Sequence, residues 1–418
     1  MKRIISLLLL AVMTLNLVAC TGGTEPETVT CIDLLEDVPA DTLGSNVLFD
    51  PTDASGVSDF AVRLLQHSAK AGENTLLSPL SVLYALAMTG NGAKEETLRQ
   101  MEAVLGQPIP VLNAYLEGYS AQLAQMQGAL KQANSIWFTD HESFTVEQSF
   151  LQTVKNHYDA SVYRVPFDDV TCRDINNWVK QKTDGMIPEI LDRIPEDAVM
   201  YLVNALAFQA KWAEPYDRLQ VQPGEFTTED GTKRPVDMLH SEESHYLELE
   251  NAIGVMKLYE GGDYAFAALL PNDCTVAELV ESLDGAQLER ALRDSIQTTV
   301  LTAIPKFETG YSTEMSEVLK TMGMPDAFDS NKADFSGLGI SDIGDLYISR
   351  VLHKTFLSLG EQGTEAGAAT VVEIRAEGAI AYPKETKTVF LDRPFVYMII
   401  DTKTCTPIFL GTMMDPSK

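Results

Sequence analysis

The sequence predicts one domain of mixed α and β structure, and three stretches of the chain support this prediction. Residues 57–69 place apolar side chains at helical spacing, which favours a helix at the start of the folded region. Residues 201–212 are apolar and interrupted by one amide, a pattern typical of a strand covered on both faces. Residues 359–375 combine the composition of a loop with the alternation of a strand. Helices and a buried sheet are therefore expected in the same domain.

Other elements follow in chain order. Residues 83–88 are small and apolar and favour a helix, and a second helix is expected after the glycine-containing turn at 90–94. Residues 133–138 have the β-branched and aromatic content of a strand. Residues 175–191 are expected to form a helix that stops at Gly185, ahead of Pro188.

The stretch at 359–375 has features of both a loop and a strand. Its first half holds three glycines and three alanines, so it has little side chain to bury and much backbone entropy to lose. Its charged residues Glu365, Glu373 and Arg375 share one face of a strand. The other face carries only small or apolar residues, namely Thr364, Ala366, Ala368, Thr370, Val372 and Ile374. This alternation indicates a loop that can enter a sheet, and the alternative is an ordinary linker that happens to alternate.

The composition excludes several classes of partner. Hydrophobic residues make up 45% of the chain and charged residues 22%, as in an ordinary soluble globular protein. The formal net charge is −29, and no basic tract interrupts the acidic sequence. The negative electrostatic potential of such a chain disfavours binding to nucleic acid, heparin-like polyanions and anionic membrane surfaces. Solubility alone is a sufficient cause of this acidity.

The first 19 residues have the pattern of a bacterial secretory signal. Lys2 and Arg3 precede an apolar run, and the run ends in Leu-Val-Ala-Cys at Cys20. This tetrapeptide resembles a lipobox, in which the cysteine receives a lipid. The sequence thus predicts a secreted lipoprotein held at the bacterial cell surface, with residues 20–50 as lipidated cysteine and acidic tether. A plain secretory signal with a chance cysteine, or a short membrane anchor, is the alternative.

The sequence contains no motif of a catalytic or metal site. Its histidines form no H-E-x-x-H motif, and no G-x-S-x-G motif is present, so no enzyme activity, metal or cofactor is expected. His240 and His245 have only a weak metal spacing and are better explained as solvated side chains. Residues 90–94 lack the spacing of a phosphate-binding loop. Four further cysteines, whose disulfide state is left open, are Cys31, Cys172, Cys274 and Cys405.

Motifs along nearly the whole chain resemble the serpin family. The segment from Glu361 to Ala366, followed by small residues, is similar to the hinge of the serpin reactive loop. Further motifs run in family order between about residues 57 and 416. They are residues 74–82 (N-x-x-x-S-P-x-S), the strand that ends at Trp212, Leu269-Leu270-Pro271, Ile304-Pro305-Lys306-Phe307, residues 323–337, residues 351–354, and residues 392–411.

The resemblance implies an α+β serpin-like domain at residues 51–418. Three β-sheets, about eight or nine helices and an exposed reactive loop at about residues 361–390 are expected. The hinge, defined here as residues 361–369, includes Glu361, Gly363, Thr364, Glu365, Ala366, Gly367, Ala368 and Ala369. The resemblance also implies a polar cluster beneath the main sheet, here called the shutter, at Ser78, Ser81, Asn204 and His353. Trp212 corresponds to the breach, where the loop first enters the sheet.

Family resemblance implies a monomeric suicide-substrate inhibitor of serine proteases, with cysteine proteases as a further class. The target protease forms a covalent acyl complex, and the cleaved loop enters the main sheet as a strand. The small residues of the hinge favour this function over the alternative, a non-inhibitory binding or structural module. Counting from Glu361 places the reactive bond at Glu377-Gly378. The distance to Pro394 is longer than usual in the family, so bonds at Arg375, Ala376, Ile380 and Ala381 stay open.

Overall fold

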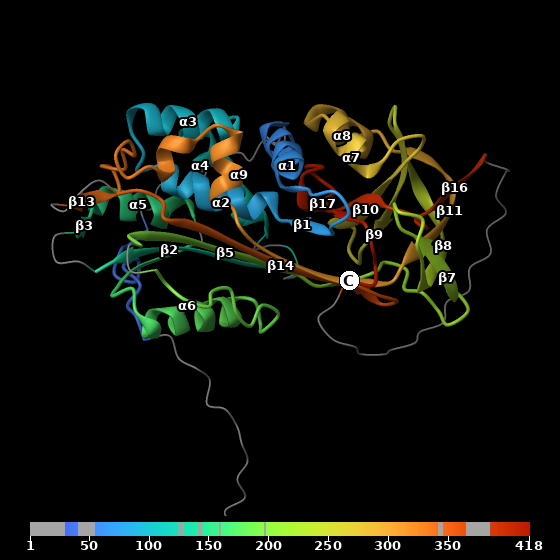
Figure 1. The fold of residues 1–418 in the computed structure, drawn as a ribbon, viewed down its shortest axis with the longest axis horizontal. Helices are drawn as coiled ribbons and strands as arrows, with labels where there is room; N and C mark the ends of the chain where they lie inside the picture. Colours follow the sequence, from blue (N-terminus) through green and yellow to red (C-terminus); the bar gives the residue numbers. More distant parts are fainter. Residues whose placement is uncertain are drawn as a thin grey trace, which may run out of the picture.

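The computed structural model describes residues 30–40, 55–123, 126, 129–140, 144–158, 160–195, 198–341, 346–364 and 385–418. Within these residues the chain forms nine α-helices, one short 3₁₀ helix and three β-sheets. Most of the helices lie on one side of the seven-stranded sheet, and the nine-stranded sheet lies beside it (Figure 1). The predicted α+β class, with three sheets and about eight or nine helices, is confirmed.

The helices are short to medium in length and are distributed along the whole chain. They are α1 (Ser55–Ser68), α2 (Pro79–Gly90), α3 (Glu95–Leu105), α4 (Ile109–Leu123), α5 (Gln148–His157), α6 (Asp169–Lys182), α7 (Val276–Ser282), α8 (Gly285–Arg293), α9 (Ser316–Met322) and the 3₁₀ helix η2 (Pro325–Phe328).

The strands belong to three sheets. The seven-stranded sheet holds β4 (Ser161–Val165), β2 (Leu130–Thr139), β5 (Met200–Phe208), β14 (Arg350–Leu359), β15 (Gly363–Thr364), β6 (Ala210–Lys211) and β12 (Phe307–Glu314). The nine-stranded sheet holds β1 (Thr75–Leu77), β18 (Pro407–Met413), β17 (Phe395–Asp401), β10 (Tyr264–Pro271), β9 (Ala252–Leu258), β8 (Lys233–Glu248), β7 (Val221–Thr227), β11 (Ile296–Pro305) and β16 (Thr386–Phe390). The third sheet pairs β13 (Gly339–Ser341) with β3 (Phe144–Val146).

The predicted central strand is β5, which is buried along its whole length. It pairs antiparallel with β2 and parallel with β14. Helix α6 covers one face of this sheet, and α2 contacts the opposite face (Figure 1). Because both faces are covered, the strand can be apolar throughout, as the sequence indicated.

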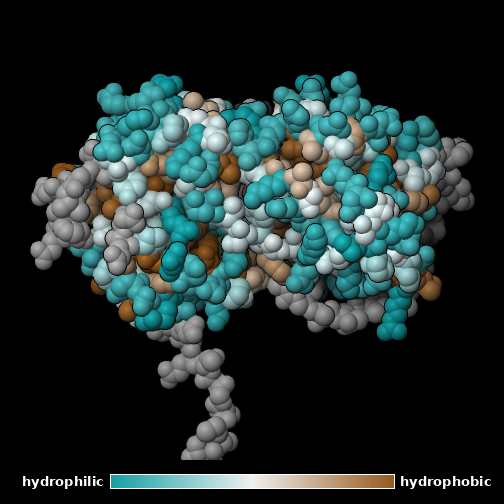
Figure 2. Space-filling model, in the orientation of Figure 1, coloured by the Kyte–Doolittle hydropathy of each residue, from teal (hydrophilic) through white to brown (hydrophobic). Residues whose placement is uncertain are grey.

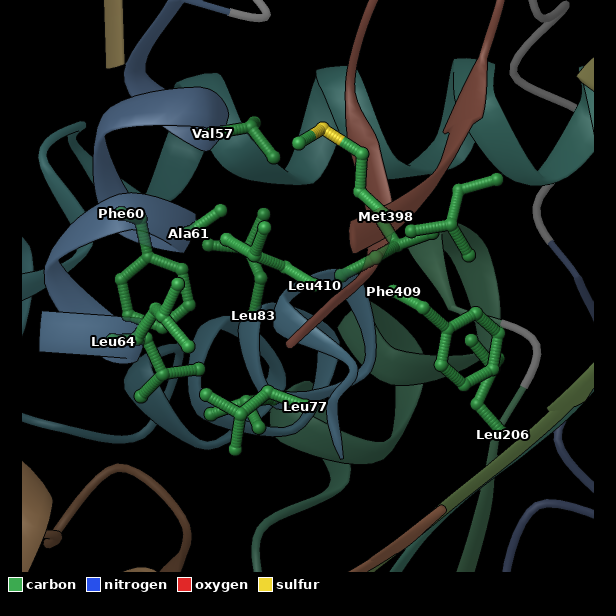
Figure 3. Packing of buried hydrophobic residues seen from close by; sticks show 14 of the residues in the cluster. Val57, Phe60, Ala61, Leu64, Leu77, Leu83, Leu206, Met398, Phe409 and Leu410 are labelled. Carbon is green, nitrogen blue, oxygen red and sulfur yellow. The ribbon is translucent and has the colours of Figure 1, made fainter. Parts of the chain in front are cut away.

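The main core lies where the two large sheets meet the N-terminal helices. Val57, Phe60, Ala61 and Leu64 of α1 point toward Leu83 of α2 and toward the strands β17 and β18 (Figure 3). All of these side chains are almost completely buried. The segments that build this core are far apart in the sequence, so the core joins the beginning and the end of the chain.

Helix α6 differs from its prediction at both ends. The helix begins at Asp169 because the Asp168 carboxylate caps it, accepting hydrogen bonds from the N–H groups of Val170 and Thr171. It ends at Lys182, slightly before the predicted stop at Gly185, and residues 183–191 follow it without helical structure. That segment folds back on the helix, where Asn176 donates to the Leu191 carbonyl at 2.7 Å.

Part of the predicted tether is attached to the folded domain. Asp33 forms an isolated bridge with Tyr163 of β4, and its carboxylate accepts a hydrogen bond from Val162 N–H at 3.0 Å. Leu35 and Val38 are buried beside it. The tether prediction is therefore wrong for residues 30–40, because two apolar side chains and a capped strand edge hold this segment in place. The predicted signal at 1–19 and Cys20 lie outside the described residues.

The surface, the described helices and the cysteines add three observations. Hydrophilic residues cover most of the face in Figure 2, in keeping with the net charge of −29. Within the described part of the chain, no helix has the length and hydropathy needed to cross a membrane. Cys31, Cys172, Cys274 and Cys405 are all free thiols.

Candidate functional site

The first residues of the hinge already lie in the main sheet. Strand β15 lies between β14 and β6: Thr364 is opposite Leu359 of β14 and Ala210 of β6, and both ladders are antiparallel. Below this point no strand separates β5 from β14 among the described residues, and the two strands pair directly with each other. The boundary between β5 and β14, here called the seam, is therefore closed except at the end where β15 enters the sheet.

A glycine is required at the first inserted position. Gly363 has φ of 154°, a conformation that side chains rarely adopt. A Cβ placed on Gly363 would lie 2.0 Å from the carbonyl oxygen of Ala210. The backbone of the hinge can approach β6 this closely only because Gly363 has no side chain.

Trp212 and its neighbours hold the turn before the hinge. The Trp212 indole N–H donates to the carbonyl of Gly360 at 2.9 Å, and its backbone N–H donates to the carbonyl of Gln362 at 2.8 Å. The backbone N–H of Tyr216 donates to the carbonyl of Glu361 at 2.9 Å. Trp212 therefore contacts the carbonyls of Gly360 and Gln362, and Tyr216 contacts the carbonyl between them, while the role of Trp212 as the breach stays a prediction.

Thr364 is the first hinge residue with a side chain on the buried face. Its exposed fraction is 0%, and its hydroxyl lies 2.7 Å from the hydroxyl of Tyr259. The ring of Tyr259 stacks on Trp212 with a centroid distance of 4.4 Å. A small polar side chain is therefore accommodated under the breach, and the pocket around it has no space for a long one.

An ion pair fixes the start of the hinge on the outside. Lys306 donates to the Glu361 carboxylate at 2.9 Å. Burial alone would raise the pKa of Glu361, but the hydrogen bond and charge of Lys306 lower it overall. Both side chains are more than a third exposed, so we assign this pair a positioning role and little stability.

The structure brings the four predicted shutter residues together beneath the sheet. Asn204 of β5 is opposite His353 of β14, and Asn204 donates to the backbone carbonyl of Ser81 at 2.6 Å. The Asn204 side chain also contacts the Ser81 hydroxyl. The Nε2 atom of His353 accepts a hydrogen bond from the backbone N–H of Ser78 at 3.1 Å. These bonds link α2 to both strands that would have to separate.

Burial holds His353 in its neutral form. Desolvation lowers the pKa of His353 from an ordinary value of 6.5 to about 4, because the ring is only 1% exposed. Neutral His353 has an unprotonated Nε2, which is the atom that accepts the Ser78 N–H. Protonation would convert this acceptor into a donor and would break the bond.

This burial predicts a loss of stability in mild acid. The unfolded chain binds a proton at His353 below pH 6.5 and the native chain only near pH 4, so the contribution is complete above pH 6.5 and is lost as the pH falls toward 4. The expected loss is about 3 kcal/mol. The measurement is the unfolding free energy of the wild type minus that of His353→Gln between pH 7 and 4. Parallel curves for the two proteins would contradict this assignment.

Some residues of the site were not predicted. Asn134 of β2 accepts a hydrogen bond from Asn204 and so extends the shutter to a third strand. Tyr259, which contacts Thr364, was also missed. An amide in the strand pattern at residues 133–138 was a possible signal for Asn134, whereas no sequence pattern connects Tyr259 to a residue more than a hundred positions away.

The remaining predicted residues lie outside the described part of the chain. These are the hinge residues Glu365, Ala366, Gly367, Ala368 and Ala369 and the reactive-bond candidates Glu377, Gly378, Arg375, Ala376, Ile380 and Ala381. Their roles stay predictions. Of the residues that the structure describes, none forms a cluster of three or more possible metal ligands.

Comparison with known proteins gives a consistent result. The family model described as "Serpin (serine protease inhibitor)" matches residues 55–416. An uncharacterised serpin-like protein of Thermococcus kodakarensis is 29% identical over 371 residues, which cover 87% of this chain and 85% of that protein. The crystal structure of the thermophilic serpin tengpin in its native state has a TM-score of 0.87 and 43% identity, and covers 92% of this chain and 99% of tengpin. Tengpin in its latent state has a TM-score of 0.76 and 41% identity, with coverage of 88% and 98%. The chain therefore belongs to the serpin family.

Proposed function

We propose that the protein is a suicide-substrate inhibitor of serine proteases. The serine of the target attacks the carbonyl carbon of the reactive bond, the new amino terminus leaves, and an ester joins the enzyme to the loop. The released hinge then enters the seam between β5 and β14 and carries the acylated protease to the far end of the sheet. Hydrolysis of the ester is prevented because the protease is distorted or displaced before water attacks.

The observation that supports this proposal best is the register of β15. Extending its two antiparallel ladders places residues 364–373 opposite residues 359–350 of β14 and, on the other side, opposite residues of β6 and β5 down to Tyr201. Arg350 and Tyr201 are already partners in the closed sheet. One inserted strand therefore fits both neighbours without a change of register in either.

The alternation of the hinge agrees with this register. Thr364 points to the buried side, and Ala366, Ala368, Thr370 and Val372 would follow it on the same face. None of these side chains is large or charged, so the inserted strand meets no steric block. The charged residues would face the other side of the sheet.

The same register predicts what happens at the shutter. Residue Thr370 would lie opposite His353 on β14 and opposite Asn204 on β5, between two residues that now face each other. The Thr370 hydroxyl can donate and accept hydrogen bonds and so can replace bonds that are lost when the strands separate. A polar network that re-forms around the new strand makes insertion irreversible in practice.

The proposal is tested with a panel of glutamate-specific, trypsin-like and elastase-like serine proteases and one cysteine protease. We expect a complex that survives detergent on a gel and releases a C-terminal peptide whose mass identifies the reactive bond. A peptide that begins at Gly378 supports the bond after Glu377. One that begins at Ala376, Glu377, Ala381 or Tyr382 assigns the bond to the residue before it.

A non-inhibitory role on the same fold is the alternative function. It would be favoured if every protease of the panel cut the loop without a covalent complex, or if none cut it. Of the two, the inhibitor is better supported because Gly363 and Thr364 are already inserted at the head of the seam.

We further propose that the protein is secreted and anchored by a lipid on Cys20, as a monomer whose membrane contact is limited to this anchor. The support is the sequence pattern that precedes Cys20. Cys20→Ala should move the protein from the membrane fraction to the medium, as measured by fractionation and immunoblotting. Cys31→Ala is the matched control and should stay with the membranes. Retention of the Cys20→Ala protein by membranes would contradict the lipid anchor.

A further inference from the structure

A pocket beside the hinge contains a buried lysine that the inhibitory mechanism does not use. The cavity has a volume of about 560 Å³ and lies between the segment 213–220 and the strands β8, β9, β11 and β16. A cavity of this size is suited to a small molecule rather than to a protein segment. From the position and chemistry of the cavity, we propose that it binds a small organic monocarboxylate with an apolar body.

Lys257 provides the positive charge of the pocket. It is 2% exposed, and its Nζ lies 4.5 Å from the centroid of the Tyr216 ring and 5.5 Å from that of Trp212. Within the described residues, Nζ has one hydrogen bond, to Glu243 at 2.7 Å. An ammonium group has three N–H donors, so Lys257 can also donate to an acceptor placed in the cavity.

The Glu243 carboxylate accepts two hydrogen bonds from its neighbours on one oxygen. The same carboxylate oxygen that accepts from Lys257 also accepts from the Ser241 hydroxyl at 2.6 Å. The Thr302 hydroxyl lies 2.9 Å from the Ser241 hydroxyl and lines the pocket as well. The hydroxyl protons of Ser241 and Thr302 are thus already donated within the protein, and a carboxylate ligand would meet the remaining N–H donors of the Lys257 ammonium at the base of the pocket.

The walls and the rim restrict the kind of acid. Phe390, Leu301 and Pro215 offer apolar surface, and Phe390 is 40% exposed when the pocket is empty. The carboxylates of Glu214 and Glu242 lie on the exposed rim. They would repel a second negative charge, so the structure favours one carboxylate attached to an aromatic or aliphatic group.

The pocket is connected to the hinge through two residues. Tyr216 and Trp212, whose rings contact Lys257, hold the carbonyls of Glu361 and Gly360. A ligand that orders Lys257 and Tyr216 should retain the hinge in its native position. This coupling rests on the proposed inhibitory function, whereas the binding site itself does not.

Binding is tested with 3-phenylpropionate as the probe and the intact purified protein, by calorimetry and by NMR of the ligand. We expect saturable binding with a dissociation constant on the order of 0.1 to 1 mM. The amide 3-phenylpropanamide and the cation 2-phenylethylammonium have the same apolar body, and we expect each to bind at least about tenfold more weakly. Equal binding of the three compounds, or no binding of the acid, would overturn the proposal.

Substitutions of pocket residues test whether the probe binds in this cavity. Lys257→Met combined with Glu243→Gln removes the ion pair as a unit, which avoids an unpaired buried charge, and should abolish binding. Lys387→Met is the matched control, because Lys387 also lies over a tyrosine ring and pairs with a glutamate but does not line the pocket. If the double variant fails to fold, Leu301→Trp fills the cavity instead. Undiminished binding to a folded pocket variant would show that the site is elsewhere.

The coupling between the pocket and the hinge is measured separately, as the rate at which the protease complex forms. Saturating 3-phenylpropionate should slow formation of the protease complex several-fold in the wild type and leave the pocket variant unaffected. Binding without an effect on the rate would refute the coupling but leave the site. If the protein forms no complex with any protease, calorimetry still decides whether the site exists.

Discussion

Thr364→Arg should convert the inhibitor into a substrate that is cut but not trapped. Thr364 is already 0% exposed and contacts Tyr259 in the intact protein, so an arginine there should keep the start of the hinge out of the sheet, and insertion would then have to bury an unpaired guanidinium beneath the breach. A penalty of about 4 kcal/mol in the insertion step slows it by roughly a thousandfold, so hydrolysis of the acyl-enzyme becomes faster than trapping. The measurement is the ratio of cleaved protein to covalent complex on a detergent gel. A Thr364→Arg protein that inhibits as the wild type does would contradict the mechanism.

Glu365→Arg is the matched control for this variant. If the β15 register continues, an inserted residue 365 would lie opposite Ser358, on the face of the sheet away from Tyr259. Because Ser358 on that face is only half-buried, the same side chain one position along the strand could reach water and should leave inhibition nearly unchanged. A loss of inhibition in both variants would indicate that the hinge tolerates no arginine for a reason other than burial.

Cleavage of the loop should make the protein markedly more stable. The closed sheet pairs β5 with β14 in parallel, whereas an inserted strand forms antiparallel ladders with both, and antiparallel pairing is the more stable arrangement. Since β14 is 10 residues long, roughly ten backbone hydrogen bonds are gained, each worth about 1 kcal/mol before the entropic cost of ordering the strand. If cleavage stabilises the protein in this way, the intact form is held in place by kinetics rather than by its free energy.

Several parts of this site could be predicted from the sequence because local pattern determines them. The period of two in the hinge depends only on the order of small and charged residues, and Thr364 is buried as that period requires. The apolar run at residues 201–212 gave the central strand β5 for the same reason. Trp212 was identified by resemblance, and the structure places it against the hinge.

Other parts depend on contacts between distant residues, which no local pattern carries. The path of the chain after α6 is one example, because the Asn176 amide accepts from the Ile190 N–H and donates to the Leu191 carbonyl, which holds this segment against the helix. Residues 30–40 have the acidic composition of a tether, yet Asp33 caps the edge strand β4 and so fixes them. Nothing in the sequence around Lys257 distinguishes it from other strand residues, because its two aromatic neighbours, Trp212 and Tyr216, are brought to it only by the fold.

The most direct test of inhibition by loop insertion is the unfolding midpoint before and after cleavage of the loop. For the wild type, we expect a rise of roughly 10 °C or more, since each kcal/mol shifts the midpoint of a large domain by about 2 °C. The Thr364→Arg protein, cut at the same bond, should gain much less because its hinge cannot enter the sheet. An equal midpoint for intact and cleaved wild type would contradict insertion as the source of inhibition.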